Sequence, residues 1–336
     1  MKKIISFGEA LIDFIPTENG LGLAQVEMFK KSPGGAPANV AVAGAKLGGN
    51  SFFAGKVGDD HFGHFLNECL KSYQVHTDYL LFTKEAKTAL AFVSLNKEGE
   101  RDFEFYGSPS ADMLFSAEEV DKSWFAGDEI FHFCSNSLSS PFSCKATEKS
   151  IELAKRAGAL ISFDPNIRFP FWSSKEKVRS TVLPLLNSVD ILKISEDELT
   201  FLLETDYERE AVGQLLKLGI SLIVVTKGAD GCSYYTESVT GTISAPHVQT
   251  IDTTGAGDAF VGGLLYRLSL LNIQKGNLRE YLNQKETLES VLEFATYCGA
   301  ITTTARGAMA ALPSLENIQE ILSSSFGLPD PTAVID

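Results

Sequence analysis

The sequence predicts an α/β fold in which a doubly wound, mostly parallel sheet is flanked by helices and carries a small β-sheet lid. Two observations lead to this prediction. Short apolar runs rich in β-branched and aromatic residues alternate with amphipathic stretches, which is typical of a parallel sheet covered by helices on both faces. Two segments, at about 13–33 and 88–110, break the alternation. We therefore expect a single domain over residues 1–336, with the lid strands inserted at these two places.

The expected elements follow one another in a regular order. The apolar runs predict core strands at 4–7, 51–57, 129–133, 160–163, 190–194 and 222–226. The amphipathic stretches predict helices, of which the clearest are 37–47, 143–157, 175–187 and 208–218. In sheets of this kind ligands bind in the crevice beyond the carboxyl ends of the strands. The functional residues are therefore expected in the loops that follow the strands.

The lid is predicted from the two irregular segments. The segment 13–33 is long, contains Gly20 and Gly22, and has no helical period. The second segment contains two strands, 88–95 and 101–105, joined by residues 96–100, and this pattern is typical of a β-hairpin. We expect the two segments to form a small antiparallel sheet that projects from the main body and covers a ligand.

The charge balance excludes some classes of partner. The chain has 29 Lys and Arg against 43 Asp and Glu, a formal net charge of −14, and no run of basic residues. Nucleic acids and acidic membranes bind to concentrated positive surfaces, so neither is expected as a partner. A small anionic substrate would instead need a local arrangement of amide donors, lysines and a metal ion.

The N-terminus and the cysteines indicate a cytoplasmic protein. The apolar run after Met1-Lys2-Lys3 ends at Gly8, so it predicts a buried strand rather than a signal peptide. No stretch approaches the roughly 20 apolar residues of a membrane helix. The cysteines are odd in number, lack a CxxC pair, and lie at Cys69, Cys134, Cys144, Cys232 and Cys298. This pattern favours reduced thiols over a disulfide framework or a zinc site.

The strongest motif is the string Asp252-Thr-Thr-Gly-Ala-Gly-Asp258, which an apolar run follows. A glycine-rich turn that opens a helix directs unpaired N–H groups and the positive end of the helix dipole outward, which suits an anionic group. Asp258, in the first turn, would lie beside that group and could accept a proton from an attacking hydroxyl. The competing interpretation is that Asp258 merely caps the helix.

A second motif is Gly34-Gly35-Ala36-Pro37-Ala38-Asn39. Its glycines and proline predict a turn before a helix whether or not the segment binds anything. The polar Asn39 is not explained by that interpretation, because it lies in an otherwise apolar segment.

These two strings resemble the two signatures of the PfkB-type (ribokinase-like) carbohydrate kinases, in the order in which that family has them. The chain resembles the fructokinases of this family over nearly its whole length, in the segments 7–13, 33–39, 55–63, 105–112 and 164–172. The resemblance implies a ribokinase-like fold and an ATP-dependent kinase. The γ-phosphoryl group of MgATP would pass to the 6-hydroxyl of D-fructose, giving fructose 6-phosphate and ADP.

The resemblance also assigns the acceptor side of the site. Asp13, at the end of the first expected strand, matches the family's sugar-binding Asp, and a carboxylate accepts hydroxyl hydrogen bonds well. Gly34, Gly35 and Asn39 match the residues that contact sugar hydroxyls. Asp258 would contact the sugar as well as act as the base. A simple turn residue at the strand end is the alternative for Asp13.

The same resemblance implies the groups that stabilise charge on the transferring phosphoryl group. They are the amides of Gly255, Ala256 and Gly257 and the side chain of Arg168, which could bind a phosphoryl group in a bidentate manner. A surface salt bridge is the alternative for Arg168. The residues expected on the nucleotide side are Lys193, Thr226, Gly228, Gly231, Gly255 and Gly257.

Two metal sites are expected from the resemblance. Glu198 matches the Glu of the family's Asn-x-x-Glu element, which organises Mg²⁺ through water, although Ser195 stands where many members have Asn. Ser195 and Glu198 also form the pattern of a helix capping box. A K⁺ site, formed largely by backbone carbonyls, would involve Asp252, Thr254, Thr302, Ala305 and Gly307.

Other activities are weighed against this one. The chain lacks the GxxxxGK string of P-loop kinases, and it lacks GxGxxG after the first strand. Gly107 stands where fructokinases often have Arg, so 2-keto-3-deoxygluconate kinase and ribokinase activities stay open. A noncatalytic sugar-binding regulator would be expected to lose Gly255, Gly257 or Asp258, and all are present. Exposed lid strands also favour a homodimer.

Overall fold

The computed structural model describes residues 1–18, 20–95, 101–271 and 273–325. Within these residues the main sheet has nine strands in the order β13-β12-β11-β10-β9-β8-β1-β4-β5. Their bounds are Lys3–Phe7 (β1), Asn50–Gly58 (β4), His76–Thr83 (β5), Glu129–Cys134 (β8), Leu160–Asp164 (β9), Ile191–Ser195 (β10), Leu222–Thr226 (β11), Cys232–Tyr235 (β12) and Thr240–Ile243 (β13). The six expected core strands are confirmed.

Strand β1 lies in the middle of the sheet, between β4 and β8, and is parallel to both. The chain adds β4 and β5 on one side of β1 and then returns to add β8 to β11 on the other side. The strand order therefore reverses next to β1, and such a switch point opens a crevice at the carboxyl ends of the strands. Among the described strands of this sheet, only β12 and β13, at one edge, run antiparallel to their neighbours.

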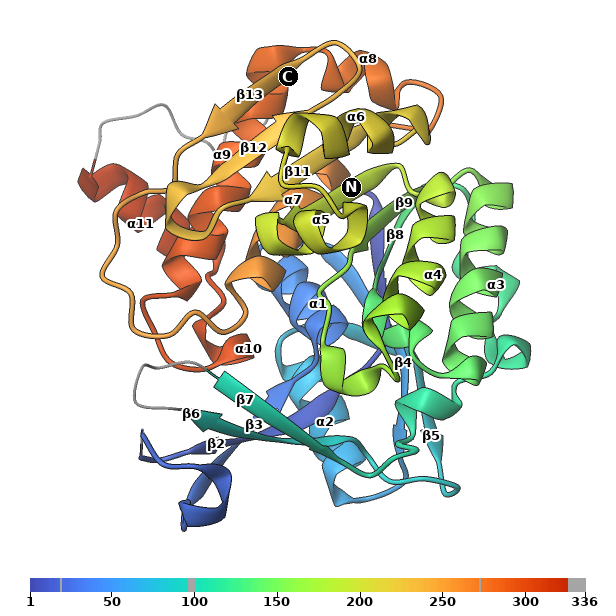
Figure 1. Cartoon of the computed structure of the whole chain (residues 1–336), viewed down its shortest axis with the longest axis vertical. Coiled ribbons are helices and arrows are strands. Elements are labelled where there is room, and N and C mark those ends of the chain that lie inside the picture. The colour runs from blue at the N-terminus through green and yellow to red at the C-terminus, as the bar shows by residue number, and fades with distance from the viewer. Residues whose placement is uncertain (19, 96–100, 272, 326–336) are drawn as a thin grey trace.

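Helices cover both faces of this sheet, as Figure 1 shows. Their bounds are Ala36–Lys46 (α1), His61–Ser72 (α2), Pro141–Ala157 (α3), Lys175–Leu185 (α4), Glu196–Leu203 (α5), Glu208–Lys217 (α6), Ala256–Leu270 (α7), Leu278–Leu282 (α8), Lys285–Thr302 (α9), Ala308–Ala311 (α10) and Leu315–Ser325 (α11). The four clearest expected helices are confirmed to within a few residues at each end.

The alternation of side chains along β1 explains how helices pack against both faces of the main sheet. Ile5 and Phe7 are buried in one core cluster with residues of α3 to α6, whereas Ile4 is buried in another cluster with residues of α7 and α9. Successive residues of a strand point to opposite faces of the sheet, so a strand that is covered on both faces is apolar throughout.

The lid is a separate sheet, in the order β3-β2-β6-β7 among the described residues. Its strands are Leu11–Pro16 (β2), Phe29–Gly34 (β3), Leu90–Leu95 (β6) and Arg101–Tyr106 (β7). The β2–β3 and β6–β7 pairs are antiparallel as expected, but the central β2–β6 pair is parallel. The reason is that β2 follows β1 and β6 follows β5, and these two strands of the main sheet run in the same direction. The expected hairpin connection 96–100 lies outside the described residues. Figure 1 shows the lid across one end of the body, beside α10.

The described residues include no helix that is both long enough and apolar enough to cross a membrane.

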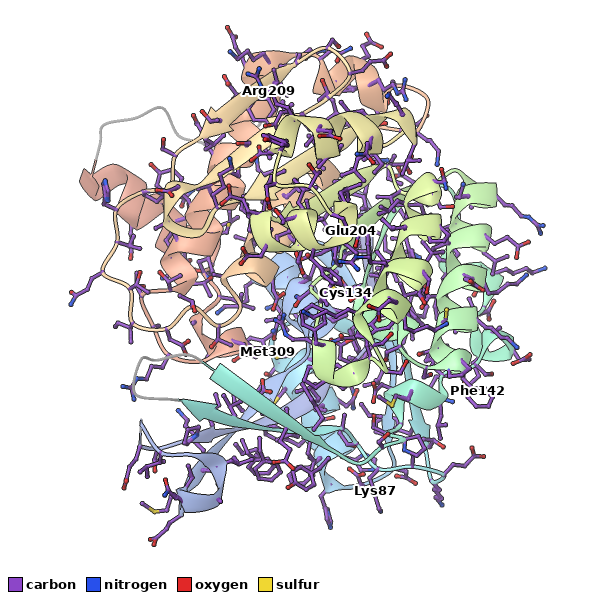
Figure 2. All side chains as sticks on the ribbon, viewed as in Figure 1. Lys87, Cys134, Phe142, Glu204, Arg209 and Met309 are labelled. Carbon is purple, nitrogen blue, oxygen red and sulfur yellow. The ribbon has the colours of Figure 1, made fainter. Side chains whose placement is uncertain are left out.

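All five cysteines are free thiols. Figure 2 shows Cys134, at the end of β8, in the interior of the body, whereas Phe142 lies at the outer rim on α3.

Candidate active site

A cavity of about 460 Å³ lies at the carboxyl end of the main sheet, beneath the lid. Its walls are formed by the loops after β1, β8 and β9, the end of β10, and the N-terminal turns of α1 and α7. The lid contributes Asp13 and Phe105. The cavity therefore occupies the crevice at the switch point, where the strand order predicts a ligand.

Asp258 lies in the first turn of α7 and is only 7% exposed. The Asn39 side chain donates a 2.8 Å hydrogen bond to one carboxylate oxygen, and the Asn166 side chain donates a 3.2 Å bond to the other. Burial raises the pKa of Asp258, while the Asn39 hydrogen bond and the charges of Arg168 and Lys193 act in the opposite direction. A buried carboxylate held in one orientation by two neutral amides is suited to accept a proton from a hydroxyl in the cavity.

The glycine turn before Asp258 has the expected form. Gly255 is the N-cap of α7 and has φ +77°, a left-handed conformation that favours glycine. A Cβ at Gly257 would lie 3.2 Å from the Lys193 ammonium nitrogen, so a side chain there would crowd the lysine. The first N–H groups of a helix have no intrahelical acceptors. This turn, with Ala256 between its two glycines, therefore offers an anion site at the cavity wall.

Two glycines shape the opposite wall. A Cβ at Gly34 would lie 2.1 Å from the Asp13 Oδ2 atom, so glycine allows the carboxylate to approach the backbone of β3. Gly35 has φ +103°, and a Cβ there would lie 2.5 Å from the Glu9 carbonyl oxygen. Asp13, Gly35 and Asn39 all line the cavity. The structure therefore brings the expected acceptor residues together.

The end of β9 and the loop after it contribute three polar residues. Asp164 ends the strand and accepts a hydrogen bond from the Asn166 amide N–H, at 3.2 Å. Asn166 has φ +41°, and such strained conformations cluster at functional sites. Arg168 also lines the cavity, and its Nη1 donates to the Ile167 carbonyl oxygen, at 3.2 Å. Further N–H groups of the guanidinium remain to bind an anion, because arginine carries five donors.

Lys193 and Asp164 form a buried ion pair, with 3.0 Å between Nζ and Oδ2. The attraction of the surrounding carboxylates, chiefly Asp164, raises the pKa of Lys193 above its usual value despite burial. Burial raises the pKa of Asp164, and Lys193 opposes that effect. Because Lys193 also lines the cavity, its charge reaches the same space as the first turn of α7.

Ser195 and Glu198 form the expected capping box of α5. The Glu198 carboxylate accepts from the Ser195 N–H and hydroxyl at 3.1 and 3.0 Å, and from the Ile167 N–H at 2.8 Å. Glu198 also lines the cavity. The described residues include no cluster of three or more His, Cys, Asp and Glu that could hold a metal directly. The arrangement fits a carboxylate that would bind the water of a metal ion, since Oε1 accepts only the Ile167 N–H and retains acceptor capacity.

The expected nucleotide loop follows β11. Thr226 is paired in register with Ser195, which lines the cavity, so this loop continues the same edge of the sheet. Gly228 begins a short 3-10 turn. A Cβ at Gly231 would lie 2.0 Å from the Ile243 carbonyl oxygen, so this glycine is required for packing against β13. None of the three lines the cavity itself.

Some residues of the expected cation site are linked by hydrogen bonds. The Asp252 carboxylate accepts from the Thr254 N–H at 2.9 Å and from the Gly307 N–H at 3.0 Å. The Asp252 N–H donates to the carbonyl oxygen of Thr303, and the sequence analysis did not single out Thr303. The Thr302 side chain is fully buried and donates to the Cys298 carbonyl oxygen. Ala305 is exposed, which leaves its carbonyl group as the group it could contribute.

Several cavity residues were not singled out by the sequence analysis, and four of them bear on the site. Glu9 and Asn136 follow β1 and β8, and the position of Glu9 after an apolar strand was the available signal. Phe105 of the lid and Phe171 of the body line the cavity together, with ring centroids 4.0 Å apart. The meeting of these two rings depends on the folded position of the lid.

Comparisons with known proteins agree with this geometry. Residues 1–315 match the family of pfkB carbohydrate kinases. Probable fructokinase-7 of Arabidopsis thaliana is 46% identical over 326 residues, which cover 96% of this chain and 93% of the relative. A fructokinase from Xylella fastidiosa with bound ATP has a TM-score of 0.88 and 38% identity, covering 96% of this chain and 98% of the other. A double mutant of a Vibrio cholerae fructokinase, with fructose, ADP and potassium ion bound, has a TM-score of 0.86, 38% identity and the same coverage.

The chain belongs to the pfkB family of carbohydrate kinases. It is accordingly a phosphotransferase with a ribokinase-like fold.

Proposed function

We propose that the protein is an ATP-dependent fructokinase that transfers the γ-phosphoryl group of ATP to the 6-hydroxyl of D-fructose. The observation that carries this proposal is the position of Asp258. Its carboxylate lies between a helix N-terminus suited to a phosphoryl group and a wall that carries Asp13, Gly35 and Asn39. The similarity to fructokinases over nearly the whole chain supports fructose as the acceptor.

In the proposed reaction Asp13 and Asn39 orient the sugar, with Gly34 and Gly35 allowing the close approach. The 6-hydroxyl oxygen attacks the γ-phosphorus, the bond from that phosphorus to the β,γ-bridging oxygen breaks, and ADP leaves with the bond's electrons. Asp258 accepts the hydroxyl proton, which moves late because a loose transition state needs little early activation. Electrostatic stabilisation of charge on the transferring group would be the largest contribution to the rate.

The groups that stabilise this charge come from three elements. The amides of Gly255, Ala256 and Gly257 face the phosphoryl group from α7, Arg168 from the loop after β9, and Lys193 from β10. Thr226, Gly228 and Gly231 would extend the nucleotide side along the edge of the sheet. Mg²⁺, with its waters held by Glu198, would supply further neutralisation of the phosphate charge. A K⁺ ion held at Asp252, Thr254, Thr302, Ala305 and Gly307 would stabilise the loop before α7.

We also propose a single domain over residues 1–336 that forms a homodimer in the cytoplasm. The lid leaves β3 and β7 as edge strands, and unpaired strand edges are ready sites for association. Five free thiols support a reducing compartment. Light scattering after size-exclusion chromatography measures the mass directly, and a monomer at micromolar concentration would contradict the dimer.

The test of the activity is ADP release with MgATP and a panel of acceptors: fructose, ribose, 2-keto-3-deoxygluconate, glucose and adenosine. We expect a clear preference for fructose, which the Asp258→Ala variant loses. A preference for another acceptor would assign that acceptor as the substrate in place of fructose. An absence of turnover with intact sugar binding would favour a noncatalytic regulator.

A further inference from the structure

Glu9 is a buried carboxylate at the acceptor wall that the reaction proposed above does not use. It follows β1, is 4% exposed and lines the cavity. Its Oε1 atom accepts two hydrogen bonds, from the Ala36 N–H at 3.3 Å and from the Asn136 side chain at 3.2 Å. Its Oε2 atom is shielded from solvent and has no hydrogen-bond partner among the described residues. Burying a carboxylate in this way is costly, so a neutral residue would serve a purely structural role better.

The two donors belong to different parts of the acceptor wall. Ala36 is the first residue of α1, directly after Gly35, at which a Cβ would lie 2.5 Å from the Glu9 carbonyl oxygen. The Asn39 N–H donates to the Gly35 carbonyl oxygen at 2.8 Å, and the Asn39 side chain donates to Asp258. Glu9 is therefore connected, through the first turn of α1, to the residue that orients Asp258.

Asn136 lies on the other side of Glu9, in the turn after β8. Its Oδ1 atom is shielded from solvent, whereas its Nδ2 atom donates one hydrogen to Glu9. A side-chain amide nitrogen carries two hydrogens, so the second is the donor that Asn136 can present to a ligand in the cavity. The carboxylate of Glu9 decides which end of the Asn136 amide faces the cavity, because a carboxylate accepts and cannot pair with Oδ1.

We propose that Glu9 is a positioning residue of the acceptor site, which holds the start of α1 and the Asn136 amide in the geometry that the sugar requires. This inference rests on the acceptor wall proposed above. Ionisation strengthens both of its hydrogen bonds, because bonds to a charged acceptor are about twice as strong as neutral ones. The carboxylate therefore improves sugar binding and destabilises the fold, a trade-off that is common at functional sites.

The burial of Glu9 supports a titration near neutral pH. Burial raises the pKa of Glu9 to about 7, and Asp112, which lines the same small cavity behind the carboxyl, acts in the same direction. Burial likewise raises the pKa of Asp112 and of Cys134, whose charges interact with that of Glu9, and Asp13, Arg168, Lys193, Glu198 and Asp258 line the same large cavity. Because the pKa of Glu9 is raised above its unfolded value, its contribution to stability is present at low pH and is lost as the pH rises through 7.

The test compares Glu9→Gln with the parent protein at pH 6 and pH 8, using steady-state kinetics and thermal unfolding. Glutamine keeps an acceptor oxygen but no charge. At pH 8 we expect the KM for fructose to rise by about threefold to tenfold, as expected for weakening two hydrogen bonds, while the KM for ATP and kcat stay within about twofold. At pH 6, where Glu9 is protonated in the parent, the two proteins should have nearly the same KM for fructose. The Tm of the variant relative to the parent should be higher at pH 8 than at pH 6.

A residue with only a structural role would give a different result: a lower Tm at both pH values and equal changes in both KM values. Either of these outcomes, or an unchanged KM for fructose at pH 8, overturns the proposal. The exposed Glu68→Gln variant is the matched control and should change neither quantity, because its side chain is 72% exposed.

Two further variants separate this proposal from the proposed acceptor wall. Asn136→Ala should raise the KM for fructose in the parent but add little in a Glu9→Ala background, because both changes break the hydrogen bond between Asn136 and Glu9. Fully additive effects of the two substitutions on the KM for fructose would show that Glu9 does not act through Asn136. Asp13→Asn tests the wall itself: if Asp13→Asn and Glu9→Gln both leave the KM for fructose unchanged, the sugar binds elsewhere. If only Glu9→Gln leaves the KM for fructose unchanged, the acceptor wall is supported and the proposed role of Glu9 is wrong.

Discussion

The Asn39 side chain donates a 2.8 Å hydrogen bond to the Asp258 carboxylate and joins two buried residues that lie 219 positions apart. Asn39 lies in the first turns of α1 and Asp258 in the first turn of α7. The N-terminal ends of these two helices therefore meet at the cavity. One helix carries the proposed sugar wall and the other the proposed phosphoryl site, so this bond connects the two substrates' sites.

Replacing Asp258 by Asn removes the proposed base with little change in shape. We expect kcat to fall by about 10²–10⁴-fold, which is the usual contribution of general acid–base catalysis. ATP binding, measured by calorimetry, should survive because the amides of the first turn of α7 remain. Turnover within about tenfold of the parent would contradict the assignment of the base.

Asn39→Ala should shift the pH dependence of kcat. The Asn39 hydrogen bond lowers the pKa of Asp258, so its loss lets burial raise that pKa further. The base must be ionised to accept a proton, and the acidic limb of the pH–rate profile should therefore move to higher pH. An acidic limb that stays in place, or moves to lower pH, would show that this bond does not tune the base.

Gly34→Ala places a Cβ where the Asp13 carboxylate lies, at a separation of 2.1 Å. Asp13 must move, and misplacement of a binding group by about 1 Å can cost up to 10²-fold. We expect the KM for fructose to rise by about tenfold or more, with the KM for ATP unchanged. Gly213→Ala in α6 is the matched control: nothing lies within 4 Å of its Cβ, so it should leave both KM values unchanged. Equal effects on both substrates would point to misfolding instead.

Lys193→Met leaves Asp164 without its partner in the interior. Breaking one side of a buried ion pair typically costs about 3–5 kcal/mol of the free energy of unfolding. The double variant Lys193→Met with Asp164→Leu should recover much of that loss, since it removes the unpaired charge as well. Urea denaturation of the three proteins measures both effects. A double variant no more stable than Lys193→Met would contradict the argument.

Phe105→Ala removes the contact between the lid and Phe171, whose ring lies 4.0 Å away between centroids. An aromatic pair contributes about 0.5–1.5 kcal/mol, so the KM for fructose should rise by up to about tenfold. A looser lid also admits water, and we expect more ATP hydrolysis per fructose phosphorylated. Comparing ADP release with fructose 6-phosphate formation measures this ratio. An unchanged ratio would show that this contact does not control water access.

The class of fold, the two glycine-rich motifs and the edge of the sheet that carries the site could all be predicted from the sequence. Apolar runs of four to seven residues predicted the central strands, because a strand covered on both faces must be apolar on both sides. The glycine strings predicted the starts of α1 and α7, because Gly35 and Gly255 need conformations that other residues avoid. The capping box at Ser195 and Glu198 was also visible, since it depends only on local spacing.

Which polar residues share the cavity, and how they are paired, depends on the packing of distant segments and could not be predicted. The parallel β2–β6 pair of the lid, the Lys193–Asp164 ion pair and the Phe105–Phe171 contact join segments distant in the chain. Glu9 follows an apolar strand in the sequence and could equally have been an exposed turn residue. Its burial, its two donors and its raised pKa result from the packing of α1 and the turn after β8 around it. Local patterns predict elements because they act over a few residues, whereas burial and charge depend on the elements that the fold places around each group.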